Sequence, residues 1–512
     1  MCYGNCKPLN MNNLHKHFPF YLALFLALIT CFRVISIQHG WITNDSILYF
    51  EMARHFAMGE TEPFEHYPWG FYPAVIALVH VISGLGIQAS ANLLIVALFM
   101  LLVWGLMRMV SIAGGNHWTQ FYAVLLLLSS GYIIGDILPM ASRDLGYWAF
   151  MVHAVNQLIL FYQQGRWKQA LHWQILALVA TLFRIEGAVQ LLVLPLAGFI
   201  VLPRSAAILK RLATPYSLLL FAPLVLLFAH ISLEDLGRVK ELFTGYDDIE
   251  MNLTQNLSHR VDVMRNEVIG ETFEEYAWFT FLLAYFSIAT LKCLGVAGWG
   301  PALLVLADRN NIRKSMQPVA YQVLLFWLFV SWVIGCLITF KVNLLSARYV
   351  ALFGFALIVL ASFAVQRLLH HQKANLTLAK RLLLIFVAGI VLIGFISNVK
   401  PKNAEFYYEI DAVEYVQSRL PTGQKVFYTS AKQRFYAEVP YDGRKDYPWD
   451  SLVKRVQDGS ISQYAYLVIQ LDDIPQNQAN LQYLQQSLPG FTLDKAFHGY
   501  KKKRRVLVFK RK

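Results

Sequence analysis

Three short motifs in this sequence place arginines beside carboxylates or an aromatic ring: Ser142-Arg-Asp144, Arg184-Ile-Glu186 and Arg348-Tyr349. A fourth feature is Asp45, a carboxylate just ahead of an amphipathic stretch. A carboxylate can take the proton of an attacking nucleophile, and an arginine can stabilise the negative charge on a leaving group. These residues therefore supply the two kinds of group that a single-displacement transfer needs.

Residues 41–59 predict a short helix that has Asn44 or Asp45 as its N-cap and ends at Gly59. Its polar face is formed by Glu51, Arg54 and His55, and its apolar face by Leu48, Tyr49, Met52, Ala53 and Phe56. An amphipathic helix of this kind lies on a membrane surface. Two interpretations of Asp45 stay open, because an Asp at a helix start is either a cap or a functional carboxylate.

The arginines at positions 143, 184 and 348 lie at or near the ends of apolar segments. Ionisable residues are costly inside a membrane, so they are functional candidates by default. The alternative is structural: the first two arginines pair with the carboxylate of their own motif, and Arg348 extends to the membrane interface.

The sequence contains neither a Gly-rich phosphate loop nor a Rossmann fingerprint. His66 and Asp144 are further candidates for binding an acceptor or a divalent ion, but no two-His or His/carboxylate spacing requires a metal. The five cysteines form no ligand cluster. The sequence therefore predicts no specific cofactor. A divalent cation stays open as an alternative.

Composition places these motifs in a membrane protein. The 512 residues are 56% hydrophobic and 15% charged, whereas a soluble domain carries about 25% charged residues. Charges are sparse from Phe18 to Ser397 and ordinary thereafter. We expect a membrane domain over residues 1–398 and a soluble domain over residues 399–512.

About eleven or twelve apolar segments are long enough to cross a bilayer. The first contains Arg33 and no small-residue cleavage site, so we interpret it as an uncleaved signal anchor. Segment 277–307 is too long for one straight helix and contains three glycines and a proline, which predict a break, and segment 69–86 is short and ambiguous. The clear candidates are residues 18–38, 88–107, 118–139, 145–162, 169–183, 187–202, 212–230, 277–307, 318–340, 350–366 and 382–398.

Clusters of Lys and Arg orient these segments, because such clusters concentrate in cytoplasmic loops. They lie at residues 204–211, 309–314 and 367–381. With these loops inside, loops 39–68 and 231–276 and the tail fall outside, so we expect the function on the outer face. The tail itself reads as α/β. Strands are expected at 425–429, 465–471, 492–497 and 505–509, and helices at 409–420, 449–459 and 477–488.

The order of these motifs resembles the GT-C superfamily of membrane glycosyltransferases, which includes the protein O-mannosyltransferases and the lipid A aminoarabinose transferases. In that family an acidic motif follows the first membrane helix and precedes a surface helix of the form Tyr-x-x-x-Ala-Arg. Tyr49, Ala53 and Arg54 match this form. The acidic motif here is Asn44-Asp45 instead of the usual Asp-Glu pair, so only Asp45 matches the catalytic carboxylate.

Further motifs extend the resemblance over most of the membrane domain. His66-Tyr-Pro-Trp-Gly-Phe-Tyr-Pro73 matches a Pro-containing aromatic segment start, and Asp144 matches a second outer acidic residue. Leu182-Phe-Arg-Ile-Glu-Gly187 resembles a Thr-Arg-Pro-Glu-Gly break, with Ile185 in place of the proline. Ala347-Arg-Tyr349 resembles the Arg-Tyr that opens a late helix, without the proline that often follows.

The resemblance implies a GT-C-like α-helical membrane fold with a C-terminal soluble α/β domain. It also implies hexosyl or pentosyl transfer from a polyprenyl-phosphate-linked sugar to a lipid, glycan or protein acceptor. The expected location is the bacterial inner membrane, with the tail in the periplasm, where a lipid donor is needed because sugar nucleotides are not expected there. Asp45 is the expected general base and Asp144 a second catalytic carboxylate. The expected substrate-binding residues are Arg54, His66, Arg143, Arg184, Glu186, Arg348 and Tyr349.

Two other function classes remain as alternatives: a transporter or flippase of lipid-linked sugars, and a polymerase-type or assembly protein for envelope polysaccharide. The sequence has no visible inverted repeat of the kind common in transporters. A nucleic-acid partner is not expected despite the net charge of +13, because much of the excess lies in short loops between apolar segments.

The predicted topology is testable by cysteine labelling. Cysteines placed at Asp247 and at Asp450, in a chain without native cysteines, should react with a membrane-impermeant thiol reagent in intact cells. Labelling only after lysis would reverse the orientation and move the proposed active face inward.

Overall fold

The computed structural model describes residues 11–60, 69–203, 208–219, 257–342, 344–370, 377–439, 449–472 and 504–512, and, between 480 and 499, residues 480, 482–483, 486, 488 and 490–499. The chain divides by its contacts into two compact units. The first comprises Met1–Val34, Leu93–Pro139 and Arg143–Val399, and the second Ile35–Asn92, Met140–Ser142 and Lys400–Lys512. Each is described by itself.

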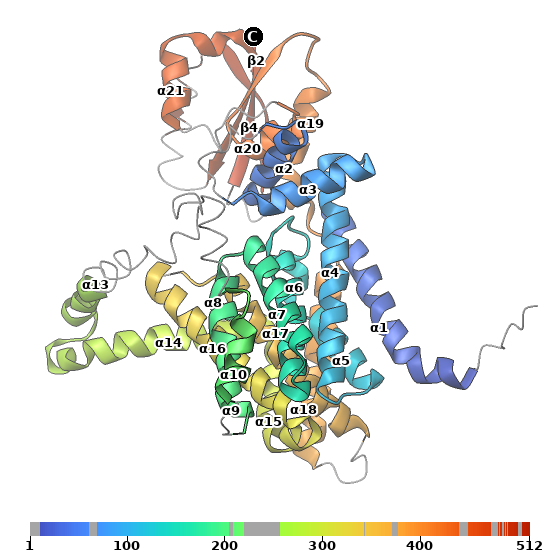
Figure 1. The fold of residues 1–512 in the computed structure, drawn as a ribbon. Helices are drawn as coiled ribbons and strands as arrows, with labels where there is room; N and C mark the ends of the chain where they lie inside the picture. Colours follow the sequence, from blue (N-terminus) through green and yellow to red (C-terminus); the bar gives the residue numbers. More distant parts are fainter. Residues whose placement is uncertain are drawn as a thin grey trace, which may run out of the picture. The chain divides into compact units, whose positions relative to one another are not determined.

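The first unit is built of apolar helices (Figure 1). Its longer helices are α1 (Met11–Ser36), α4 (Ile87–Ile112), α5 (His117–Leu128), α6 (Asp144–Gln164), α7 (Trp167–Phe183), α8 (Glu186–Val193), α14 (Ala277–Val296), α15 (Trp299–Ser315), α16 (Pro318–Val342), α17 (Ala351–His370) and α18 (Leu378–Val399). Shorter helices are α9 (Gly198–Val201), α10 (Ile208–Ala213) and α13 (Leu257–Val263).

Six helices in the described residues are long and apolar enough to cross a membrane, or seven if a bent pair forms one span. This number is smaller than the predicted eleven or twelve. Helices α6, α7 and α8 occur where segments were predicted, but they are too short or too polar to be among these six. Most of segment 212–230 lies outside the described residues.

Segment 69–86 forms α3 (Phe71–Ser83), a helix of 13 residues. At 1.5 Å per residue α3 is about 20 Å long. A bilayer core is about 30 Å thick, so α3 is too short to cross it.

Two of the predicted segments are broken. The chain turns between α14 and α15 at Gly298, whose φ of +86° lies in the region that only glycine adopts without strain. This confirms the predicted break. Segment 118–139 consists of α5 and a π-helix, η2 (Gly131–Ile137), with a bend of 57° between them. That bend was not predicted.

Helix α17 is central to the first unit. It packs against α5, α14, α15 and α16, and most of its side chains are buried. In α18 the buried residues are Val387 and Asn398, whereas Ile385, Phe386, Leu392 and Ile393 are exposed. Such an apolar face needs lipid or another apolar surface against it.

The second unit contains a four-stranded sheet in the order β1-β2-β4-β3. Strand β1 (Lys425–Tyr428) runs parallel to β2 (Tyr464–Asp472). Strand β4 (Arg504–Arg511) is antiparallel to both β2 and β3 (Phe491–His498). All four predicted strands are thereby confirmed.

Helices cover both faces of this sheet because the strands alternate two apolar sets. Leu467 and Leu507 pack with Leu452 of α21 (Trp449–Gln457), whereas Tyr466 and Val508 share the other core. Helix α19 (Tyr408–Gln417) covers this second face together with α20 (Ala431–Tyr436), which was not predicted. The predicted helix 477–488 falls largely outside the described residues.

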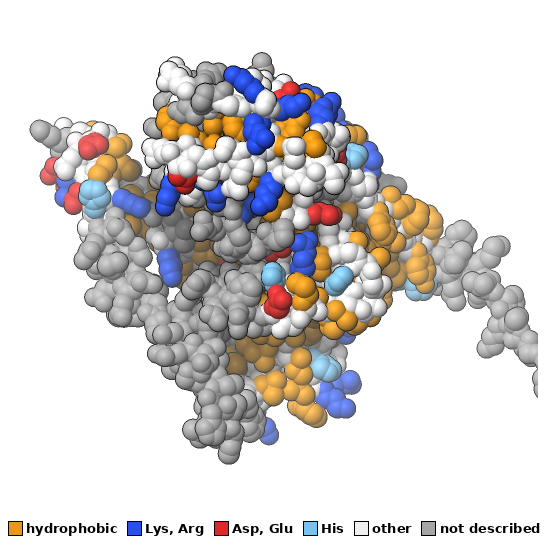
Figure 2. Space-filling view, turned by 90° about the horizontal axis from the view of Figure 1, so that it is seen from above, with side chains coloured by type: hydrophobic (Ala, Val, Ile, Leu, Met, Phe, Trp, Pro, Cys, Tyr) orange, Lys and Arg blue, Asp and Glu red, His pale blue; other side chains and the backbone are white. Residues whose placement is uncertain are grey.

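Figure 2 shows basic side chains dispersed among apolar and neutral ones over the surface seen from above.

The first predicted outer loop also belongs to the second unit, where α2 (Asn44–Ala57) packs against α3 and α20. The predicted N-cap was wrong. Thr43 caps α2, and its Oγ1 accepts a hydrogen bond from the Ser46 N–H at 3.1 Å. Asn44 and Asp45 are the first two helical residues, so Asp45 is not the side chain that caps α2.

The predicted polar face of α2 was wrong for Glu51, which is only 2% exposed. The cause is tertiary: one side of α2 meets α3 through Tyr49 and Tyr72, and another side meets α20 through Phe50 and Phe435. Helix α2 is therefore held between two helices.

A stability test follows from the close approach of α6 and α7. A Cβ at Gly146 would clash with the ring of Phe183, whereas a Cβ at Gly389 in α18 would meet nothing within 4 Å. We expect Gly146→Ala to destabilise the protein by about 1–3 kcal/mol, as overpacking typically does. Gly389→Ala is the matched control and should leave the melting temperature in detergent unchanged or slightly higher. Equal melting temperatures for the two variants would contradict this packing.

Candidate functional site

The charged motifs of the first unit meet where helices begin and end. Helices α6 and α7 are joined by a turn at Gly165, so the start of α6 lies beside the end of α7. Asp144 is the first residue of α6, and Arg184 is the C-cap of α7. Glu186 begins α8 two residues later.

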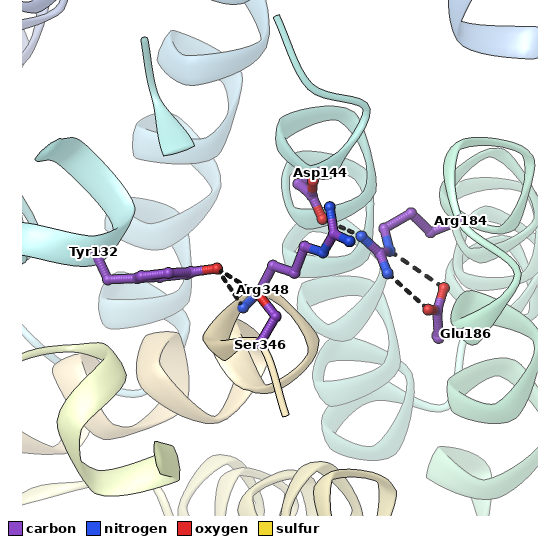
Figure 3. Close-up of polar contacts among 6 residues, drawn as sticks. All are labelled: Tyr132, Asp144, Arg184, Glu186, Ser346 and Arg348. Atoms are coloured by element: carbon purple, nitrogen blue, oxygen red, sulfur yellow. Dashed lines mark hydrogen bonds and ion pairs between the residues drawn. The ribbon is translucent and has the colours of Figure 1, made fainter. Parts of the chain in front are cut away.

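Arg184 is buried and binds two carboxylates (Figure 3). It forms a buried ion pair with Asp144, and the two side chains are 2% and 1% exposed. Its Nη2 and Nε donate to the two oxygens of Glu186 at 2.7 and 3.2 Å, which is a bidentate arrangement. The structural interpretation of the Arg184-Ile-Glu186 motif is therefore confirmed, and Asp144 is an additional partner.

Helix dipoles favour this arrangement. The two carboxylates lie at helix N-termini and Arg184 lies at a helix C-terminus, which are the ends that stabilise each charge. The local breaks in the chain thus place each of the three charges at a favourable position.

Arg348 approaches the same cluster from the 3-10 turn η10 (Ala347–Val350), which leads directly into α17. Its backbone N–H donates to the Tyr132 hydroxyl at 2.8 Å, and that hydroxyl is 3.0 Å from Ser346 Oγ. Figure 3 shows its side chain extending toward Asp144 and Arg184. A cation at a helix N-terminus is opposed by the dipole, so an anion nearby stabilises it.

Tyr349 lies close to two guanidinium groups. The Cζ atoms of Arg184 and Arg348 are 4.7 and 5.5 Å from the centre of its ring, within the range of cation–π attraction. Arg143 precedes α6 and interacts electrostatically with Glu186. The predicted residues Arg143, Asp144, Arg184, Glu186, Arg348 and Tyr349 thus form one group, which we term the arginine cluster.

The arginine cluster gathers several cationic groups. Among its described residues there are three arginines and two carboxylates. Guanidinium groups gathered in surroundings of low dielectric favour an anionic ligand. Because arginine presents its donors in a planar fork, a phosphate or carboxylate is the ligand type that suits it.

The other predicted site residues lie in the second unit or outside the described residues. Asp45 is exposed in the first turn of α2. Arg54 Nη1 pairs with both oxygens of Glu51 at 3.2 Å. Burial raises the pKa of the Glu51 carboxyl, and the charges of Arg54, His55 and Arg434 oppose that shift. His66 lies outside the described residues.

Sequence reasoning missed Tyr132, Ser346 and Tyr147. Tyr147 is fully buried one turn after Asp144, close to the charges of the arginine cluster. Tyr132 lies in the π-helix η2, and π-helices are frequent at functional sites. Nothing in the apolar sequence around Tyr132 indicates a π-helix, so only the structure reveals its contact with Arg348.

In the described part of the chain, no group of three or more His, Cys, Asp or Glu residues is placed to hold a metal ion.

No family model and no curated protein matches this sequence. Two solved structures are similar to this chain. The chain is similar to the crystal structure of ArnT from Cupriavidus metallidurans in the apo state, with a TM-score of 0.56 and 13% identity over 96% of this chain and 97% of that one. It is also similar to ArnT from the same organism bound to undecaprenyl phosphate, with a TM-score of 0.54 and 14% identity over 96% and 98%. The chain therefore shares the fold of these ArnT structures, which agrees with the α-helical membrane fold and C-terminal α/β region expected from the order of the motifs.

The ion pairs of Arg184 predict how three variants rank in their free energy of unfolding. Arg184→Gln would leave two carboxylates without their shared buried cation, and we expect a loss of about 3–5 kcal/mol. Asp144→Asn keeps the pair with Glu186 and should cost less. Arg184→Gln combined with Asp144→Asn and Glu186→Gln should regain part of the loss, because the two carboxylates are then no longer buried as charges without Arg184. Thermal unfolding in detergent measures all three, and an unchanged melting temperature for Arg184→Gln would contradict the ion-pair assignment.

Proposed function

We propose that this protein is a membrane glycosyltransferase that moves a sugar from a polyprenyl-phosphate-linked donor to an acceptor on the outer face of the membrane. The observation that carries the proposal is the arginine cluster, in which three arginines meet among apolar helices, in a fold shared with ArnT. A solved ArnT structure contains undecaprenyl phosphate, which is a ligand of the type that this cluster suits.

The reaction is a single displacement at the anomeric carbon of the sugar. The acceptor oxygen forms a new bond to that carbon, the bond between the carbon and the phosphate oxygen breaks, and polyprenyl phosphate leaves with the electron pair. The acceptor gives its proton to a general base. The protein must therefore supply a base for the acceptor and positive charge for the leaving phosphate.

In the proposal Arg348 is the principal contact of the leaving phosphate, together with Arg143. Arg348 lies at a helix N-terminus, where backbone N–H groups also favour an anion. Arg184 is held by two carboxylates, so it contributes its charge to the site and keeps Asp144 and Glu186 in place. Asp144 is buried in this ion pair, and we therefore assign it a positioning role instead of direct proton transfer.

Asp45 is the proposed general base. It is exposed, it follows the first membrane helix, and it matches the catalytic carboxylate of the GT-C motif. Thr43 is the N-cap of α2, so Asp45 does not have the capping role that was the alternative to a functional one. Arg54 and His66 of the same predicted loop are proposed to help bind the substrates.

A transporter or flippase of lipid-linked sugars remains the second candidate, because the arginine cluster would also suit recognition of a lipid phosphate. The two functions differ in covalent chemistry. A transferase breaks the bond between sugar and phosphate, whereas a flippase returns its lipid unchanged.

The base assignment predicts that Asp45→Asn lowers the turnover of sugar transfer by about 10²-fold or more, since a general base typically contributes 10²–10⁴-fold. Asparagine is nearly isosteric, so expression and melting temperature should not change. Glu60→Gln is the matched control because it also removes an exposed carboxylate from this loop region. Transfer at the wild-type rate by purified Asp45→Asn would reject this residue as the base.

The proposed role of Arg348 predicts that its variants lose transfer activity to different degrees. Arg348→Lys keeps the charge but loses the planar fork, so it should retain part of the activity, whereas Arg348→Gln should lose about 10²–10³-fold in kcat, on the scale of one electrostatic donor. Arg108→Gln is the control, since Arg108 is an exposed arginine of α4. Small and equal losses for both Arg348 variants would identify the residue as a structural anchor.

A further inference from the structure

Residues 400–512, here termed the C-terminal domain, contact the chain segment just before Asp45, which belongs to the same unit. Helix α20 of this domain places the Tyr436 hydroxyl where it accepts a hydrogen bond from the Ile42 N–H at 3.0 Å. Ile42 immediately precedes Thr43, the cap of α2, and lies three residues before Asp45. Lys432, one turn earlier in α20, lies with its Nζ 5.2 Å from the ring centre of Trp41.

A second set of contacts joins α20 to the body of α2. Phe435 packs against Phe50 with 5.7 Å between ring centres, and the Arg54 guanidinium lies 6.0 Å from the Phe435 ring centre. Arg434 acts electrostatically on the buried Glu51. Helix α20 therefore touches both α2 and the residues that lead into it.

The contacting side of α20 is itself fixed. A capping box closes its N-terminus, in which the side chains of Ser430 and Gln433 each bind the backbone of the other residue. Lys432 is held by Glu409 of α19 at 3.1 Å. The contacts to residues 41 and 42 therefore start from an anchored element of the domain.

The turn before Asp45 is tied to its surroundings at other points too. The Tyr407 hydroxyl donates to the Ile37 carbonyl at 2.6 Å, and Gln88 Nε2 donates to the Gly40 carbonyl at 3.2 Å. His39 and Gly40 adopt φ values of 45° and 80°. A non-glycine residue in this left-handed region is strained, so surrounding contacts must hold it there.

We propose that α20 of the C-terminal domain positions the start of α2, which carries Asp45, and that Tyr436 is the positioning residue of this contact. The inference rests on the proposed role of Asp45 and assigns a function to the domain: it orders the start of α2 and the residues that lead into it. Tyr436 touches no reacting atom, and it acts through the backbone of Ile42.

The consequence for rate follows from geometry. A general base must lie within hydrogen-bond reach of the proton that it takes, and small displacements of catalytic groups cost large factors in rate. Loss of the Ile42–Tyr436 bond would loosen the turn without changing the charge of Asp45. Turnover should fall, and the apparent affinity for the lipid donor should change little.

The test is Tyr436→Phe, which removes only the hydroxyl. We expect kcat to fall about tenfold, the scale of one hydrogen bond, with KM for the donor within about twofold. Tyr428→Phe is the matched control, because Tyr428 is a buried tyrosine of the same domain and belongs to its core. It should leave both constants unchanged.

Coupling to Asp45 separates positioning from a general structural effect. If Tyr436 acts through Asp45, then Tyr436→Phe should have no further effect on turnover in the Asp45→Asn background. A conservative variant adds a check: Lys432→Arg should keep the wild-type rate, whereas Lys432→Met should lower it. A tenfold loss that persists in the Asp45→Asn background would overturn the proposal.

A second measurement does not depend on activity. Hydrogen–deuterium exchange of the peptide over residues 41–49 should become faster in Tyr436→Phe and stay unchanged in Tyr428→Phe. Unchanged exchange in Tyr436→Phe would overturn the positioning role, whatever the rates. Faster exchange with unchanged turnover would also overturn it. Failure of the transfer reaction in the wild-type protein would instead reject the proposed function, so the two failures are distinguishable.

Discussion

The arrangement of the helical unit depends on one buried cation. Arg184 is 2% exposed among apolar helices, a position that is stable only if carboxylates neutralise it. Asp144 and Glu186 do so from the first residues of α6 and α8, and each helix dipole favours the charge at its end. The end of α7 and the starts of α6 and α8 are thereby fixed to one another.

Arg184 and its two carboxylates together carry a formal charge of −1. The charges of Arg348 and Arg143 bring the described residues of the cluster to +1, and three guanidinium groups gathered at one place can attract an anion. Tyr349 lies against both Arg184 and Arg348, and Tyr132 holds the backbone of Arg348. The cluster therefore holds three guanidinium groups through defined contacts, and preorganised cationic groups of this kind are what stabilisation of a leaving phosphate requires.

Much of the fold was predictable because it rests on local signals. The strands at 425–429 and 465–471 show β-branched and aromatic runs, and the break at Gly298 follows from glycine and proline within a long apolar segment. The bidentate pair of Arg184 and Glu186 was also predictable as an alternative, because the two residues are neighbours in the sequence.

Features that depend on contacts between distant residues were not predictable. Asp144 is 40 residues from Arg184 along the chain, and Ile42 is 394 residues from Tyr436. The helical pattern of α2 predicts that Glu51 is a surface residue, but the packing of α2 against α3 and α20 buries it. The π-helix around Tyr132 has no local signature among apolar residues.

The proposed glycosyl transfer breaks the bond between a sugar and a polyprenyl phosphate. The most direct measurement incubates the purified wild-type protein in lipid with a donor labelled in both sugar and lipid, together with an acceptor fraction from the cell envelope. If the proposal is correct, free polyprenyl phosphate and labelled sugar bound covalently to the acceptor should appear in equal amounts. Redistribution of intact donor across the membrane, with no release of polyprenyl phosphate, would contradict it.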